Sequence, residues 1–322
     1  MKKFLKISII ILSVFAIALA IPYFTYLIIT KDAKLDESKL CGTGQSVIIY
    51  DDENNEITSA SLSAQKKSIS VENLQKHTID AFIASEDRTF FKHNGLNYKR
   101  MLKALYKNIT SGSFKEGAST ISQQLIKNTH LSQDKTIKRK LYEIKLTRRL
   151  EKKYNKNQIL EMYLNTIYFG HSCYGLQSAS QFYFNKNADS LNLEESATIV
   201  GLLTSPNNFS PFKNPEKCLY RRKVVLNAML ECGYIDQTEF NSAVESPLNT
   251  EKNSSSEQYG DYIDAIFDEL EELDFGRYTL SEGCIIKTYL NGNIQTYIED
   301  IDYTGDNAVI ITDNISGGVK AF

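Results

Sequence analysis

The stretch ASEDRTFFKHNG, residues 84–95, gathers acidic, basic and aromatic side chains directly after an apolar segment. Residues 81–83, Ala-Phe-Ile, predict the buried face of a helix that ends near Glu86. A carboxylate at such a junction is expected to be partly desolvated, which suits general acid or base chemistry. The alternative is a structural role, in which Glu86 ends the helix and pairs with Arg88 or His93. Taken alone, the stretch favours that alternative.

A second stretch, GASTISQQLIKN at residues 117–128, places small and polar residues near an expected helix start. Its hydroxyls and amides provide neutral donors and acceptors that suit a sugar or a phosphate at a helix N-terminus. These side chains are Ser119, Thr120, Gln123 and Gln124. The alternative is an amphipathic helix with a Ser or Thr cap, which is the commoner meaning of the pattern on its own.

A third stretch, residues 135–154, is rich in charge. Arg139 and Glu143 are four residues apart, so on a helix they share a face. The alternative is a solvated helix face with several ion pairs, which is the usual meaning of a charge run.

Apolar periodicity along the rest of the chain predicts a mainly helical fold. Helices are expected at residues 72–86, 97–110, 117–127, 135–151, 156–165, 174–183, 193–203 and 216–231. Ser119 and Thr120, Asn157 and Asn192 lie near three of the expected helix starts. Short strands are expected at residues 47–50, 284–286 and 308–311.

The amino terminus predicts a membrane anchor. Lys2, Lys3 and Lys6 precede an apolar run from Ile7 to Ile29, which is long enough to cross the hydrocarbon core of a bilayer. The lysines favour a cytoplasmic start, which places the rest of the chain on the outer face of the membrane. A cleaved signal peptide is the alternative, because residues 18–20, Ala-Leu-Ala, resemble a cleavage site.

Composition excludes some classes of function. A net charge of -2 gives no electrostatic case for nucleic-acid binding. The chain has five scattered cysteines and four histidines, so a structural zinc site is not expected and most thiols are expected to be free.

In order along the chain, the three stretches resemble the signature of glycosyltransferase family 51, the peptidoglycan polymerase module of class A penicillin-binding proteins and monofunctional glycosyltransferases. The motif E-D-x-x-F-x-x-H-x-G is met by Glu86–Gly95 without a mismatch. The motif G-x-S-T-I-T-Q-Q is met by Gly117–Gln124, with Ser122 in place of the threonine. The motif R-K-x-x-E begins at Arg139, and the similarity covers residues 70–232.

The resemblance implies a lysozyme-like, two-lobed helical domain over residues 33–245, after an anchor at residues 1–32. Residues 246–322 are expected to be a linker and a short β-containing remnant of a transpeptidase region. The sequence has no K-T-G motif, and Ser63–Lys66 fits S-x-x-K only by chance, so no penicillin-binding serine is expected.

The implied activity is polymerisation of lipid II into β-1,4 glycan strands on the growing undecaprenyl diphosphate chain, with release of undecaprenyl diphosphate at the outer face of a bacterial cytoplasmic membrane. Glu86 would be the general base, and Glu143 would orient the neighbouring cations or join a metal shell. Mg²⁺ or Mn²⁺ is the implied cofactor, moenomycin the implied inhibitor and a separate transpeptidase the implied partner. The diphosphate would be met by Lys127, Lys135, Arg139 and Lys140, while Ser119, Thr120, Gln123, Gln124, Arg88 and His93 would contact substrate.

One position departs from the family pattern, because Lys135 stands where the family has an arginine. The charge is kept, but the planar fork that binds phosphate in two places is lost. Two other functions remain open: a lysozyme-like lytic enzyme that also uses one glutamate, and a non-catalytic scaffold of the cell-wall machinery.

Overall fold

The computed structural model describes residues 20–21, 23–40, 48–57, 67–111, 119–131, 136–171, 173–250, 285–299 and 309–321, with short pieces at 259, 262–263, 265–266, 269–270 and 301. The helices of these residues are α3 (Lys76–Glu86), α4 (Tyr98–Ser111), α5 (Ile121–His130), α6 (Ile137–Lys153), α7 (Lys156–Thr166), α8 (Leu176–Phe184), α9 (Leu193–Leu202), α10 (Pro215–Glu231), α11 (Gln237–Glu245) and α14 (Gly292–Glu299). Short 3-10 turns occur at Glu37–Leu40, Val71–Asn73, Phe90–Lys92 and Ala188–Ser190. The mainly helical class is confirmed.

The helix starts follow from local capping. Thr120, Asn155, Asn192 and Asp236 each accept a hydrogen bond from the third helical residue, whose side chain bonds back to the backbone of the cap. The prediction of Asn157 as a start signal was wrong, because Asn155 and Gln158 make the reciprocal pair that begins α7. Helix α11 was not expected, although the same signal is present in its cap, Asp236.

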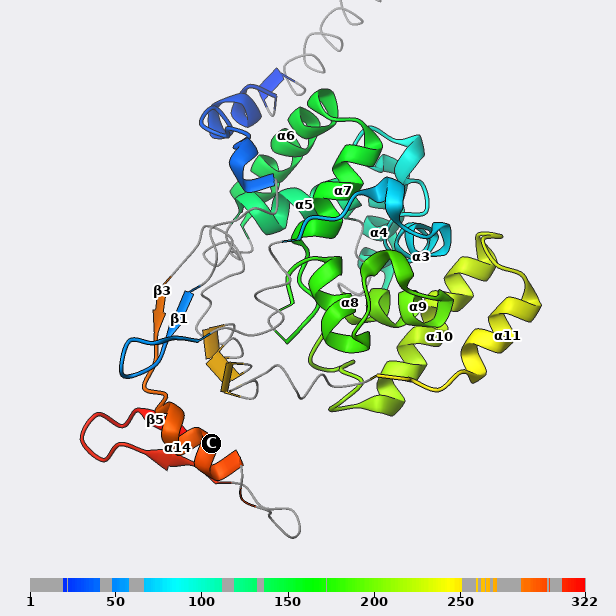
Figure 1. The fold of residues 1–322 in the computed structure, drawn as a ribbon. Coiled ribbons are helices and arrows are strands. Elements are labelled where there is room, and N and C mark those ends of the chain that lie inside the picture. Colours follow the sequence, from blue (N-terminus) through cyan, green and yellow to red (C-terminus); the bar gives the residue numbers. More distant parts are fainter. Residues whose placement is uncertain are drawn as a thin grey trace, which may run out of the picture.

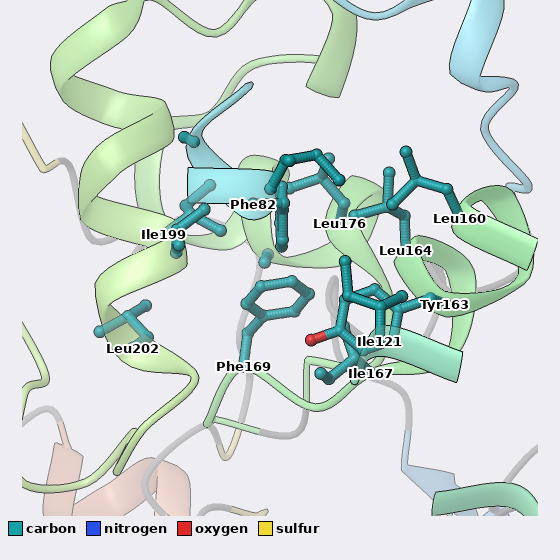
Figure 2. Close-up of a cluster of buried hydrophobic side chains, with 14 of the residues drawn as sticks. Phe82, Ile121, Leu160, Tyr163, Leu164, Ile167, Phe169, Leu176, Ile199 and Leu202 are labelled. Atoms are coloured by element: carbon teal, nitrogen blue, oxygen red, sulfur yellow. The ribbon is translucent and has the colours of Figure 1, made fainter. Parts of the chain in front are cut away.

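The core surrounds α9, in which all residues from Glu195 to Leu202 are buried. Helix α3 packs against α9 and α10. Its Phe82 lies edge-on to Tyr163, with ring centroids 6.3 Å apart, and to Phe169 at 6.2 Å (Figure 2). Truncating a buried phenylalanine typically costs about 3 to 5 kcal/mol. This packing fixes the end of α3, where Glu86 lies.

A small sheet lies to one side of helices α3 to α11 (Figure 1). Its strand order is β2 (Glu56–Ile57), β1 (Ile48–Tyr50) and β3 (Ile285–Lys287). Strand β1 runs parallel to β3, so segments far apart in the sequence pair directly. Strands β4 (Ile311–Thr312) and β5 (Val319–Ala321) form a hairpin beside α14. The strands expected at residues 47–50 and 284–286 form as β1 and β3, whereas of the strand expected at 308–311 only Ile311 lies in a strand, β4, and residues 309 and 310 do not.

The segment after the expected anchor is bound to α6. Lys145 donates to the carbonyl of Thr30, Arg149 donates to the carbonyl of Ala33, and Lys153 pairs with Glu37. These basic residues are four apart and share one face of α6.

Most of the expected anchor, including residues 7–19, lies outside the described residues. Within the part of the chain that the structure describes, no helix has the length and apolar character needed to cross a bilayer. Among the cysteines described there, Cys173, Cys218 and Cys232 form no disulfide with one another.

Candidate active site

Glu86 is the last residue of α3 and is half-buried. Its Oε2 accepts a hydrogen bond from Nε2 of Gln124 at 2.8 Å. The structural pairing considered for Glu86 was with Arg88 or His93, but both have other partners. Arg88 bonds Glu231 of α10 at 2.7 Å, and Nε2 of His93 bonds Asp87 at 2.8 Å. The contact to Gln124 instead joins the first of the three sequence stretches, residues 84–95, to the second, residues 117–128.

Asp87 links the same two stretches behind Glu86. Its side chain is 1% exposed, and its Oδ2 also accepts from the backbone N–H of Ile121 at 3.3 Å. Nδ1 of His93 accepts from the N–H of Gly95, so Nε2 is the ring nitrogen that carries the proton toward Asp87. The hydroxyl of Thr120 donates to the carbonyl of Gly95 at 2.6 Å. Asp87 was not among the site residues predicted from sequence.

Two adjacent glutamines on α5 connect the two glutamates. Gln124 contacts Glu86, whereas the buried Gln123 donates its Nε2 to Oε1 of Glu143 at 2.8 Å. Glu143 lies on α6 and is 2% exposed. Neighbouring positions on α5 therefore each bind one of the two carboxylates. Ser119, which precedes the cap Thr120, is half-buried.

Cations surround Glu143. The ammonium of Lys140 pairs with Oε1 of Glu143, and Nη1 of Arg139 lies 3.9 Å from Oε2. The Nε and Nη1 groups of Arg139 are buried and find no hydrogen-bond acceptor within the described part of the chain. Buried guanidinium donors without an acceptor are costly, so they suit an anion that arrives with the substrate.

Two further cations were predicted from the sequence, Lys127 and Lys135. Lys127 lies on α5 with an exposed side chain. Lys135, together with residues 112–118 that include the start of the second stretch, lies outside the described residues.

A basic cleft of about 1090 Å³ lies beside Glu86, between the end of α3 and the start of α4. Arg100 on its wall donates from Nη1 to the backbone carbonyl of Glu86 at 2.7 Å. Sequence reasoning missed most of its cations, because those on α4 follow the ordinary spacing of an amphipathic helix. The cations that line it are Arg88, Lys92, Lys99, Arg100, Lys103 and Lys107.

The hydrogen-bond donors around Glu143 leave its carboxylate unsuited to bind a metal ion. Its Oε1 already faces an ammonium and an amide N–H, and its Oε2 faces a guanidinium. No group of three acidic, histidine or cysteine side chains able to hold a metal ion occurs within the described residues. Binding of Mg²⁺ or Mn²⁺ therefore remains a prediction, in which the ion binds the diphosphate of the substrate, because diphosphate oxygens are ligands for a hard cation.

Comparison with known proteins identifies the family. A family model described as Transglycosylase matches residues 53–230. The chain belongs to the transglycosylase family. This result confirms the resemblance found in the three stretches, and the matched residues include Glu86, Gln124 and Glu143.

Relatives of this transglycosylase family member include penicillin-binding proteins. It is 34% identical over 334 residues to penicillin-binding protein 1F of Bacillus subtilis (strain 168), covering 99% of this chain and 46% of that protein. It is 38% identical over 210 residues to penicillin-binding protein 1A of Aquifex aeolicus (strain VF5), covering 65% of this chain and 28% of that protein. The crystal structure of penicillin-binding protein 1A from Haemophilus influenzae is similar at 23% identity and a TM-score of 0.38, over 79% of this chain and 28% of that one. The chain thus spans less than half the length of these relatives.

Proposed function

We propose that the protein is a peptidoglycan glycosyltransferase that polymerises lipid II. The observation that carries the proposal is Glu86, a half-buried carboxylate whose partner Gln124 is next to Gln123, the partner of Glu143, in a domain that also holds two sets of cations. One set is Arg139 and Lys140 beside Glu143, and the other lines the basic cleft. A carboxylate base together with such cations suits a reaction in which a hydroxyl attacks a sugar that carries a diphosphate.

The proposed step forms one bond and breaks one. The 4-hydroxyl of the acceptor's N-acetylglucosamine loses its proton to Glu86 as its oxygen attacks C1 of the donor's N-acetylmuramic acid. The C1–oxygen bond to the diphosphate breaks, and the lipid diphosphate leaves with the electron pair. Attack from the opposite side inverts C1 and gives a β-1,4 linkage. A positioned general base typically contributes a factor of about 10² to 10⁴.

The leaving diphosphate gains negative charge as the bond breaks, and preorganised donors stabilise that charge. The Nε and Nη1 groups of Arg139, which have no hydrogen-bond acceptor among the described residues, and the ammonium of Lys140 supply such donors. Glu143 holds both cations in place from a buried position. Lys127 and Lys135 are proposed to extend this cluster.

Both substrates of the proposed reaction carry a lipid diphosphate, and the site offers two cationic regions. The cluster on α6 suits the donor, whose diphosphate leaves. The basic cleft, which includes Arg100 in contact with the Glu86 carbonyl, suits the diphosphate of the acceptor. A lytic enzyme would expel a neutral sugar hydroxyl, and neither cationic region would then be needed.

Membrane anchoring through residues 7–29 is part of the proposal. The lipid chains of the substrate lie in the bilayer, so an anchored enzyme meets them at the surface. Contacts from Lys145 and Arg149 to the carbonyls of Thr30 and Ala33 support a fixed distance between the anchor and α6. A lysozyme-like fold in two lobes is the arrangement expected for this family.

Incubation of the purified full chain with lipid II and Mg²⁺, followed by gel separation of the products, tests the function. The polymerase proposal predicts glycan strands from lipid II and no cleavage of finished strands. Cleavage of finished strands would favour the lytic enzyme. A folded protein that binds moenomycin but makes no polymer would favour the scaffold.

A further inference from the structure

A short chain of hydrogen bonds runs from the core of the protein to Glu86. The hydroxyl of Tyr163 on α7 donates to Oε1 of Gln124 at 3.0 Å. The Nε2 of the same amide donates to Oε2 of Glu86 at 2.8 Å. Three residues from three helices are therefore connected in one line, with the carboxylate at its end.

Tyr163 is held rigidly at the start of this chain. Its side chain is 0% exposed, and its ring lies edge-on to Phe82 among apolar neighbours (Figure 2). Burial, with the nearby negative charges of Glu86 and Asp87, raises the pKa of Tyr163 well above its usual value. The hydroxyl therefore keeps its proton at any working pH and needs an acceptor.

The proton of Tyr163 fixes which way the Gln124 amide is turned. If the amide were flipped, Nε2 would face the tyrosine oxygen and Oε1 would face the carboxylate of Glu86. Two lone-pair acceptors would then oppose each other, and the buried tyrosine proton would lose its acceptor. With the observed hydrogen-bond pattern, the amide always presents an N–H to Oε2 of Glu86.

We propose that Tyr163 is a positioning residue that acts through Gln124 to hold one oxygen of Glu86, so that the other oxygen receives the acceptor proton. This role rests on the proposed function, because it concerns the alignment of the base in that reaction. Small errors in the position of a catalytic group reduce the rate of the chemical step much more than they reduce binding.

The test is Tyr163→Phe, and the chain offers a matched control in Tyr183→Phe. Tyr183 is also 0% exposed, and its hydroxyl donates to the backbone carbonyl of Phe169 at 2.9 Å. Each variant removes one buried hydroxyl and its hydrogen bond to an acceptor. Only the hydroxyl of Tyr163 leads to Glu86.

The kinetics of lipid II polymerisation distinguish positioning from stability. Tyr163→Phe is expected to lower kcat about tenfold or more while KM stays within about twofold. Tyr183→Phe is expected to keep kcat within about twofold, with a similar change in Tm. Equal kcat values in the two variants would overturn the role of Tyr163.

A second variant removes the same link from the other end. Gln124→Met takes away the amide at a half-buried position and should lower kcat at least as much as Tyr163→Phe does. If Tyr163 acts only through Gln124, the double variant should be no slower than Gln124→Met alone. A further tenfold fall in the double variant would contradict the proposal.

Failure of the proposed function would look different. A wild type that makes no polymer contradicts the function and, with it, the role of Tyr163. An active wild type with an inactive Glu86→Gln variant and an unaffected Tyr163→Phe variant contradicts the role of Tyr163 alone.

Discussion

The environment of His130 predicts that the free energy of unfolding falls in mild acid. It is the last residue of α5, and its Nε2 accepts a hydrogen bond from the backbone N–H of Asp36 at 3.0 Å. Burial lowers the pKa of His130 from 6.5 to about 4, and Lys39 acts in the same direction. The Asp36 carbonyl and carboxylate act against this shift without cancelling it. The neutral ring therefore joins α5 to the segment that follows the expected anchor.

The size of the effect follows from the two pKa values. The pKa of His130 in the folded protein, about 4, is lower than the ordinary histidine value of 6.5, so the unfolded chain binds the proton more tightly. The contribution of His130 to the free energy of unfolding is therefore fully present above about pH 6.5 and is lost as the pH falls toward 4. One pKa unit corresponds to about 1.4 kcal/mol, so the loss from this residue at pH 5 is about 2 kcal/mol.

Urea unfolding of the full chain in detergent, at pH 7.5 and pH 5.0, measures this loss. The wild type should lose about 2 kcal/mol more between the two pH values than His130→Gln does. Identical pH dependence in wild type and His130→Gln would refute the reasoning.

Three further outcomes are expected. Lys140→Ala should lower the rate of polymerisation by a factor of about 10² or more, because it removes a cation from the leaving diphosphate. An unchanged rate in single-turnover kinetics would mean that the lysine does not contact the diphosphate. Gly95→Ala should destabilise the fold by about 1 to 3 kcal/mol in urea unfolding, since its φ is +84° and an added Cβ would lie 2.8 Å from Glu151, whereas Gly233→Ala, with φ +71° and no neighbour within 4 Å, should cost less. A fluorescent penicillin should leave the chain unlabelled, while moenomycin should bind it; labelling of any serine would contradict the domain assignment.

Local signals in the sequence predicted much of the fold. Apolar periodicity located the helices, and the caps Thr120 and Asn192 begin α5 and α9 as expected. Asn157 was the wrong cap because two asparagines flank the helix start, and only Asn155 has its partner three residues later. The parallel pairing of β1 with β3 depends on tertiary structure, which no local pattern encodes.

In the candidate site too, local features could be predicted from the sequence, whereas contacts between helices could not. The residue types and their order along the chain were visible in the three stretches, but their partners were not. The contacts of Gln124 with both Tyr163 and Glu86 depend on how three helices pack. The basic cleft was missed because the lysines of α4 have the spacing of an ordinary solvated helix face.

The most direct test of the central claim is the initial rate of lipid II polymerisation by Glu86→Gln. The matched control is Glu161→Gln, since Glu161 is also half-buried and accepts a hydrogen bond, from the N–H of Val71 at 3.0 Å. An amide keeps the size of the carboxylate but accepts no proton, so Glu86→Gln should be at least about a hundredfold slower while folding and moenomycin binding persist. Glu161→Gln should stay near the wild-type rate. Wild-type polymerisation by Glu86→Gln would contradict the assignment of Glu86 as the base.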